Sequence, residues 1–246
     1  MDSKKELIGK LQRDILQWQG FKSPQADAIT NFGLGAIENA FPNGVFPTGA
    51  IHEVMSPEPE HAAVAGGFIG ALLGQLMKKD EGACIWISTN RKLFPAGLDE
   101  FKASAHHIIF IDVATEKDVL WAMEEALKCE GLAAVIAEVK DISFAQSRRL
   151  QLATENSKVT GFLLRNGKQK AGASTCVARW QVSPLPSQTE GNLPGVGYPR
   201  WRVDLLKVRN GNPGSWKIEW AAGEFVPVIE TQTAQMHEFE EIRQVG

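Results

Sequence analysis

The sequence predicts an α/β fold with a mainly parallel central sheet flanked by helices and with antiparallel strands towards the C-terminus. Continuous apolar strands alternate with helical segments up to Leu164, and strands with alternating apolar and polar residues follow after Arg165. Continuous apolar strands indicate a parallel sheet covered on both faces, whereas alternation indicates antiparallel strands with one solvated face. A hydrophobic fraction of 43% in 246 residues is sufficient for such a core.

The N-terminal part is predicted to form one amphipathic helix, Lys4–Gln19, which Gly20 ends. Its apolar residues recur at three- and four-residue steps, and they are Leu7, Leu11, Ile15 and Trp18. The segment Gly33–Gly49 is rich in Gly and Pro, which predicts loops and turns. The chain therefore divides into three predicted parts: an N-terminal helix and linker (1–32), a core domain (33–229) and a polar C-terminal tail (230–246).

The core is predicted to alternate strands with helices. The predicted parallel strands are Ala50–Met55, Ala83–Ser88, His107–Val113, Leu132–Val139 and Val159–Leu164. The predicted helices are His61–Lys78, Glu116–Cys129 and Ser143–Asn156. The first helix is packed with Ala and Gly, which we expect to let it lie close against the sheet. The later strands, expected to form an antiparallel set, are Ala173–Val182, Arg200–Val208 and Ser215–Ala222.

Charge and hydropathy argue against two classes of partner. The formal net charge is −3, so the chain lacks the overall basic excess that strong non-specific DNA binding usually shows. The N-terminus mixes charged and apolar residues and resembles neither a secretory signal nor a transit peptide. The most apolar stretch, His61–Met77, is short and rich in small residues for a bilayer span. These features predict a cytoplasmic protein that does not engage a membrane.

The segment Asn43–Val54 resembles the start of the RecA core, in which a turn leads into the first strand and on to the phosphate loop. In that frame the loop spans Ser56–Ala63. Ser56 takes the place of the first Walker A glycine, His61 the second glycine, Ala62 the lysine and Ala63 the Ser/Thr that holds magnesium. Without the lysine, no side chain from the loop neutralises the β- and γ-phosphates.

The same loop carries groups that oppose an anionic ligand. Pro57 and Pro59 remove two backbone donors, and Glu58 and Glu60 add negative charge. An ordinary strand-turn-helix connection would also explain this loop by itself, and the flanking match favours a degenerate RecA-like core. The segment therefore predicts a protein that is not an ATPase and needs no nucleotide cofactor.

Two further positions follow from the RecA frame. Asn90 stands where a glutamate would activate the attacking water, and an amide cannot act as that base. Glu138 ends the expected Walker B strand, Ala133–Glu138, and retains a carboxylate near the metal-coordinating position. A strand-end acid in solvent is an equally good interpretation of Glu138. The histidines show no ligand spacing with Cys or acidic residues, so we predict no metal site.

A set of ordered fragments resembles the bacterial ImuA family, RecA-like accessory proteins of damage-induced mutagenesis that are often grouped with the SulA cell-division inhibitors. The resemblance covers roughly Leu34 to Ala222. The fragments are Pro47–Val54, His61–Phe68, Leu93–Leu98, Val119–Leu127, Arg148–Ala153, Ala178–Trp180, Pro199–Val203 and Val208–Trp220. Each fragment is weak alone, but their order and spacing together are specific.

The resemblance implies a non-enzymatic role in SOS-induced, error-prone translesion DNA repair. Proteins of this family act with an ImuB-type Y-family polymerase homologue and an error-prone polymerase, which implies a scaffold. An alternative is a regulator that caps or inhibits RecA filaments, or a SulA-like inhibitor of cell division. The helix Lys4–Gln19 is expected either to serve self-association or docking, as N-terminal elements do in RecA filaments, or to pack on its own domain.

Five basic residues are candidates for contacts with DNA or a partner: Arg148, Arg149, Arg165, Lys168 and Lys170. The last three lie in or beside a segment that corresponds to a DNA-binding loop of RecA, and such side chains can contact phosphates. A solvated loop and helix face is the more common role of such clusters. Four tryptophans of the late strands are expected to pack in the core, with base stacking as the alternative, and they are Trp180, Trp201, Trp216 and Trp220.

Overall fold

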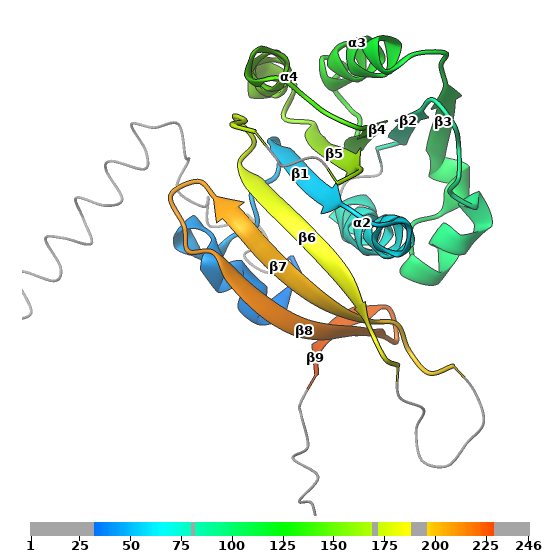
Figure 1. The fold of residues 1–246 in the computed structure, drawn as a ribbon, viewed down its shortest axis with the longest axis vertical. Coiled ribbons are helices and arrows are strands. Elements are labelled where there is room, and N and C mark those ends of the chain that lie inside the picture. The colour runs from blue at the N-terminus through cyan, green and yellow to red at the C-terminus, as the bar shows by residue number, and fades with distance from the viewer. Residues whose placement is uncertain (1–31, 80–81, 169–171, 188–195, 229–246) are drawn as a thin grey trace, which may run out of the picture.

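A computed structural model describes residues 32–79, 82–168, 172–187 and 196–228 (Figure 1). The strands of these residues form one nine-stranded sheet in the order β3-β2-β4-β5-β1-β6-β7-β8-β9. The predicted class, an α/β fold with a mostly parallel sheet and antiparallel C-terminal strands, is confirmed. The predicted helix Lys4–Gln19 and the tail from Glu230 lie outside the described residues.

The parallel part of the sheet is buried on both faces. Its strands are β1 (Ile51–Ser56), β2 (Cys84–Ser88), β3 (Ile108–Asp112), β4 (Ala134–Val139) and β5 (Thr160–Asn166). All six residues of β1 are buried, because both faces of the strand are covered: Ile51 enters one apolar cluster and Val54 the other. In the register of β1 and β5, Glu53 lies opposite Leu163 and Ser56 lies opposite Asn166.

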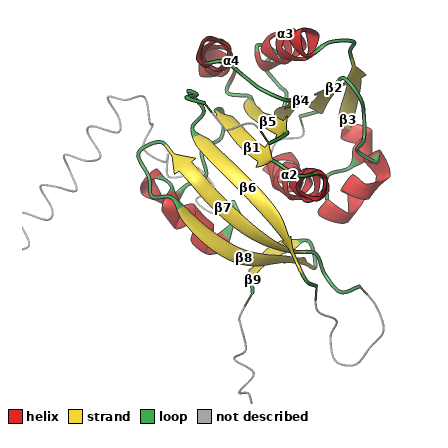
Figure 2. Cartoon of the chain, viewed as in Figure 1, coloured by secondary structure: helices red, strands yellow, loops and turns green. Residues whose placement is uncertain are grey.

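Helices cover the two faces of this part of the sheet (Figure 2). One face packs against α2 (Pro59–Lys79), and the other packs against α3 (Glu116–Leu127) and α4 (Phe144–Ser157). The start of α4 is fixed by a capping box, in which Ser143 and Gln146 satisfy each other's backbone N–H groups. The structure thus confirms the three predicted helices, and α2 begins two residues before the predicted start.

The glycines of α2 were expected to let the helix lie close against the sheet, but they contact a different segment. A Cβ atom added at Gly67 would lie 2.9 Å from the Phe101 ring, and one at Gly74 would lie 2.4 Å from the Phe101 carbonyl oxygen. Phe101 ends the 3₁₀ helix η3 (Pro95–Phe101). The side of α2 that faces the sheet carries larger residues such as Phe68, whose ring lies 5.8 Å from that of Trp180 in β6. The glycines of α2 therefore allow η3 to pack closely against the helix, and they do not face the sheet.

The remaining strands are β6 (Ala178–Leu185), β7 (Arg200–Val208), β8 (Gly214–Ala221) and β9 (Glu224–Pro227). The prediction of a wholly antiparallel set is wrong for β6, which pairs parallel to β1 and antiparallel to β7. Burial alternates along β6 and β7. This alternation reports how many faces of a strand are covered, and it does not report the direction of the neighbouring strand.

The late tryptophans pack as expected. Trp180, Trp201 and Trp220 are at most 4% exposed, and Trp216 packs against the same cluster. The loop-rich segment Gly33–Gly49 contains two short 3₁₀ helices, η1 (Gly35–Ala40) and η2 (Pro42–Gly44), and a third, η4 (Ala105–His107), precedes β3.

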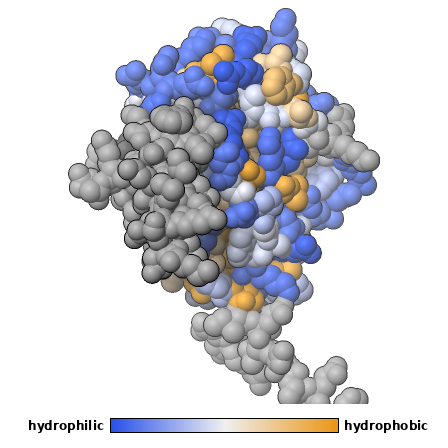
Figure 3. All heavy atoms as spheres, turned by 90° about the vertical axis from the view of Figure 1, so that its left-hand side faces the viewer, coloured by the Kyte–Doolittle hydropathy of each residue, from blue (hydrophilic) through white to orange (hydrophobic). Residues whose placement is uncertain are grey.

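Hydrophilic residues predominate on the side of the molecule seen in Figure 3, and apolar residues gather there in small groups only. Within the described ranges, no helix is both long enough and apolar enough to cross a membrane.

Candidate functional site

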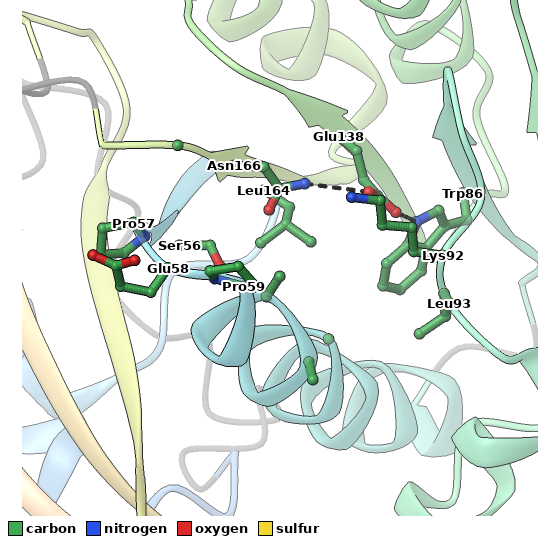
Figure 4. Close-up of a pocket in the computed structure, with 14 residues that line it drawn as sticks. Ser56, Pro57, Glu58, Pro59, Trp86, Lys92, Leu93, Glu138, Leu164 and Asn166 are labelled. Atoms are coloured by element: carbon green, nitrogen blue, oxygen red, sulfur yellow. Dashed lines mark hydrogen bonds between the residues drawn. The ribbon is translucent and has the colours of Figure 1, made fainter.

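A pocket of about 350 Å³ opens at the carboxyl ends of the parallel strands, beside the first turns of α2 (Figure 4). Open α/β sheets bind their ligands at this edge. Strands and loops of the sheet supply most of the wall, and α2 supplies the rest. The lining residues are Ser56, Pro57, Glu58, Pro59, Ala62, Ala63, Gly66, Trp86, Lys92, Leu93, Glu138, Leu164, Asn166 and Gly167.

The structure brings together most of the residues predicted for a degenerate nucleotide site. Ser56, Glu58, Ala62 and Ala63 from the loop frame line the same pocket as Glu138 from the Walker B frame. The other three predicted positions do not line it: they are Glu60, His61 and Asn90.

The connection between β1 and α2 is shorter than the predicted loop Ser56–Glu60. Only Pro57 and Glu58 separate the strand from the helix. The N–H groups of His61 and Ala62 both donate to the Glu58 carbonyl oxygen, at 3.0 and 3.3 Å. The bond from Ala62 is the first regular bond of the helix, but the bond from His61 uses an N–H that a phosphate cradle would leave open to the ligand, and Pro59 has no N–H.

Glu138 is a hydrogen-bonded wall of the pocket and not a solvated strand end. Trp86 Nε1 donates to Glu138 Oε1 at 2.8 Å, and Asn166 Nδ2 donates to Oε2 at 3.3 Å. Burial raises the pKa of the Glu138 carboxyl, while the hydrogen bonds from Trp86 and Asn166 and the charge of Lys92 oppose that rise. The interpretation of Glu138 as an acid in solvent is therefore wrong.

Two oxygen atoms of the pocket have no hydrogen-bond partner among the residues that the structure describes. They are Ser56 Oγ and Asn166 Oδ1, and both atoms are buried. The rest of the lining is largely apolar, with proline, alanine and leucine side chains around the Trp86 ring. The arrangement therefore combines an apolar enclosure with hydrogen-bond acceptors that nothing in the described chain uses.

Among the residues of the pocket that sequence reasoning missed, three carry polar or aromatic side chains: Trp86, Lys92 and Asn166. Asn166 could have been found, because it follows the predicted strand Val159–Leu164 closely, and the ends of parallel strands share one edge of the sheet. Lys92 likewise follows β2. No sequence signal distinguishes Trp86 from the other buried tryptophans.

Comparison with known proteins identifies relatives. No protein-family model matches the chain. Protein ImuA from each of two strains of Caulobacter vibrioides is 33% identical over 202 residues, which are 78% of this chain and 83% of the relative. The chain belongs to the ImuA family. This confirms the resemblance drawn from the ordered fragments.

In this ImuA-family chain, Arg165 is part of a buried ion cluster. The Arg165 side chain donates through Nη1 to Glu53 Oε1 at 2.6 Å and through Nη2 to Asp141 Oδ1. Arg179 Nε and Ser174 Oγ donate to Glu53 Oε2 at 2.7 and 3.1 Å. We call these five residues the Glu53 cluster. Arg165 is 1% exposed, so the expectation that it contacts DNA phosphates is wrong.

The other basic candidates lie on the surface of this ImuA-family chain. Arg148 is 3.9 Å from Glu155, Arg149 is 2.5 Å from Glu124, and Lys168 is 3.0 Å from Glu58. Exposed ion pairs of this kind contribute little stability, so the pairs do not prevent these side chains from meeting a partner. DNA or partner contact at these residues stays a prediction. Lys170 lies outside the described residues.

Proposed function

We propose that this chain is a non-catalytic accessory protein of SOS-induced, error-prone translesion DNA repair. Its RecA-like core acts as a scaffold for an ImuB-type Y-family polymerase homologue and an error-prone polymerase. Membership of the ImuA family implies involvement in the translesion mutagenesis pathway. The finer proposal, a scaffold without catalysis, is supported by the chemistry of the pocket.

The RecA-like assignment is supported by the placement of β1 and α2. β1 lies inside the parallel part of the sheet, between β5 and β6, and it leads directly into a helix that covers one face. The pocket forms at the end of β1, where a nucleotide-binding α/β core places its phosphate loop.

The observation that carries the non-catalytic proposal is the content of this pocket. Alanines at 62 and 63 stand in the frame positions of the Walker lysine and Ser/Thr, and both line the pocket. Glu58 and Glu138 add carboxylates to the lining. One cation, Lys92, also lines the pocket, but its charge acts on Glu138. Because Glu58 is paired with Lys168, a triphosphate would meet chiefly the carboxylate of Glu138 and few free donors.

Calorimetric titration with Mg-ATP tests the loss of nucleotide binding. We expect no saturable heat up to millimolar ATP, under conditions in which an active RecA protein binds. Tight, magnesium-dependent binding would contradict the non-catalytic proposal.

Size-exclusion chromatography tests the scaffold. The full chain, mixed with its ImuB-type partner and the error-prone polymerase, is expected to co-elute with them in one complex. Separate elution at several salt concentrations and at micromolar protein would contradict the scaffold, whatever the ATP titration gives.

A further inference from the structure

The unsatisfied oxygens of the pocket lie next to each other at the sheet edge. Ser56 ends β1 and Asn166 ends β5, and the two residues are paired in the register of these strands. Ser56 is 2% exposed. Buried polar atoms in native proteins almost always have partners, so each exception requires a reason. Two neighbouring exceptions in the wall of one pocket indicate that a ligand supplies the missing partner.

The orientation of Asn166 shows which kind of group is missing. Its Nδ2 donates to Glu138 Oε2 at 3.3 Å, because a carboxylate needs a donor opposite it. This leaves Asn166 Oδ1 as an acceptor, and Figure 4 shows it turned away from Glu138. Ser56 Oγ can also accept. The free positions therefore match a ligand that donates an N–H or O–H group.

The remainder of the lining sets the charge and size of the ligand. An anion would meet the carboxylate of Glu138, since Glu58 is paired with Lys168, whereas a cation would compete with Lys92 for Glu138. The walls around these groups are apolar, with Leu93 and Leu164 beside the Trp86 ring. A volume of about 350 Å³ is at the lower end for ligand pockets, which favours a single ring over a nucleotide.

We propose that this pocket receives one aromatic side chain of a partner protein, a tryptophan or a tyrosine, whose N–H or O–H donates to Asn166 Oδ1 or Ser56 Oγ. The inference rests on the proposed scaffold function, because it names the surface by which the scaffold holds its partner. Tryptophan and tyrosine combine a large apolar ring with one donor, and they dominate the energetics of protein interfaces. A water molecule would satisfy the acceptors and leave the apolar walls unused.

Small aromatic probes test the chemistry of the pocket in the full chain. Indole, which carries an N–H donor, and 1-methylindole, which does not, are titrated separately and followed by protein NMR. We expect indole to bind about tenfold more tightly, because 1-methylindole leaves the acceptors unpaired. Asn166→Leu is expected to bring the two affinities close together. Equal affinities in the unsubstituted protein, or no binding of indole, would show that the pocket holds water only and would overturn the proposal.

A pair of matched variants tests whether the partner protein binds at the pocket. Ala63→Trp places a large ring at the pocket from an exposed position of α2, and Ala145→Trp makes the same change at an exposed position of α4, which covers the other face of the sheet. Thermal unfolding confirms that both variants fold. We expect Ala63→Trp to lose indole binding and to weaken the polymerase complex at least tenfold, and Ala145→Trp to retain both.

The outcomes separate this inference from the scaffold function on which it rests. If Ala63→Trp abolishes indole binding but leaves the complex intact, the pocket is not the docking site, and the inference fails while the scaffold stands. If the unsubstituted chain forms no complex at all, both proposals fail. If Ala63→Trp loses the complex, Ala145→Trp keeps it and the unsubstituted chain prefers indole to 1-methylindole, both the scaffold function and the docking pocket are supported.

Discussion

Strands β1 and β5 carry buried polar side chains on both faces of the sheet, and the two sets differ in how fully they are hydrogen-bonded. On the face covered by α3 and α4, the Glu53 carboxylate accepts from Arg165, Arg179 and Ser174. On the face covered by α2, Ser56 Oγ and Asn166 Oδ1 have no partner within the described part of the chain. Both regions are buried and are formed by residues only a few positions apart, so burial alone does not explain the difference.

This difference distinguishes buried polar groups that stabilise the fold from buried polar groups that are available to a ligand. A buried charge without a partner is very costly, so the Glu53 cluster is stable only when carboxylate and guanidinium groups meet. Within the cluster, Arg165 Nε alone is unsatisfied. Ser56 Oγ and Asn166 Oδ1 belong to neutral groups, so leaving them without a partner costs less free energy than leaving a charge unpaired.

The largest effect is expected from Glu53→Ala. This change leaves Arg165 and Arg179 facing each other without the carboxylate between them, and we expect the free energy of unfolding to fall by about 3–5 kcal/mol. Urea denaturation measures the loss. If the alanine variant does not accumulate as folded protein, Glu53→Gln keeps the volume and one acceptor and is expected to show a smaller loss.

Asp141→Asn is the matched control at the edge of the same cluster. The Asp141 side chain is 59% exposed, so its pairing with Arg165 is screened by water. We expect a loss of at most about 1 kcal/mol. Similar losses for Glu53→Ala and Asp141→Asn would contradict the view that the cluster depends on its buried carboxylate.

His52 is a fully satisfied polar group on the same face as the pocket. Its Nε2 donates to the Pro47 carbonyl oxygen at 2.7 Å, and its Nδ1 accepts from Trp180 Nε1 at 3.2 Å. Burial lowers the pKa of His52 to about 4, and the hydrogen bond to Pro47 opposes part of this shift. The folded protein therefore holds a neutral imidazole at a pH where the unfolded chain already takes up a proton.

This shift predicts a pH dependence of stability. The contribution of His52 is fully present above pH 6.5, the pKa of the unfolded chain, and it is lost as the pH falls towards about 4. The expected loss between pH 7 and pH 4.5 is about 2 kcal/mol, and His52→Gln, which can both donate and accept, is expected to remove it. Urea denaturation of the unsubstituted protein and of His52→Gln at pH 7 and pH 4.5 measures how much stability each loses. Other titrating groups contribute equally to both proteins, so the difference between the two losses reports His52. Equal losses in the two proteins would contradict this assignment.

The sequence predicted the elements better than it predicted their contacts. Apolar runs located β1 and β2 to within a residue, because most side chains of a strand that is covered on both faces must be apolar. The early start of α2 was missed even though Pro59 is a residue type favoured in the first turn of a helix. Arg165 was placed in an exposed loop because the apolar run ends at Leu164. Its partner Glu53 is 112 residues away, so no local pattern could reveal the ion pair.

The pocket was predictable in position and not in chemistry. The frame around Ser56, Ala62 and Ala63 placed the site at the end of β1, and the strand ends placed Glu138 beside it. The sequence identified what the site lacks for binding a nucleotide. It could not show which oxygen atoms stay unpaired, because that depends on the rotamers of Ser56 and Asn166 and on their distance from every other donor.

The smallest effects are expected from two serine substitutions that compare the faces directly. Ser147 is fully buried in α4, where its Oγ donates to the Phe144 carbonyl oxygen at 2.8 Å and accepts from Thr175 N–H at 3.1 Å. Ser147→Ala removes these two hydrogen bonds and a longer one from Thr175 Oγ1 at 3.4 Å, and it is expected to cost about 1–2 kcal/mol. Ser56→Ala removes a hydroxyl that has no partner, so we expect a change within about 0.5 kcal/mol, or a small gain. Urea denaturation of the two variants measures the contrast.

Equal losses in the two serine variants would mean that Ser56 has a hydrogen-bond partner in solution, and the contrast between the faces would then disappear. A stable Ser56→Ala protein that binds indole more weakly would give the opposite result. The hydroxyl would then contribute to binding without contributing to folding. This combination is what a ligand site predicts, because a group kept only for the fold would lower stability when it is removed.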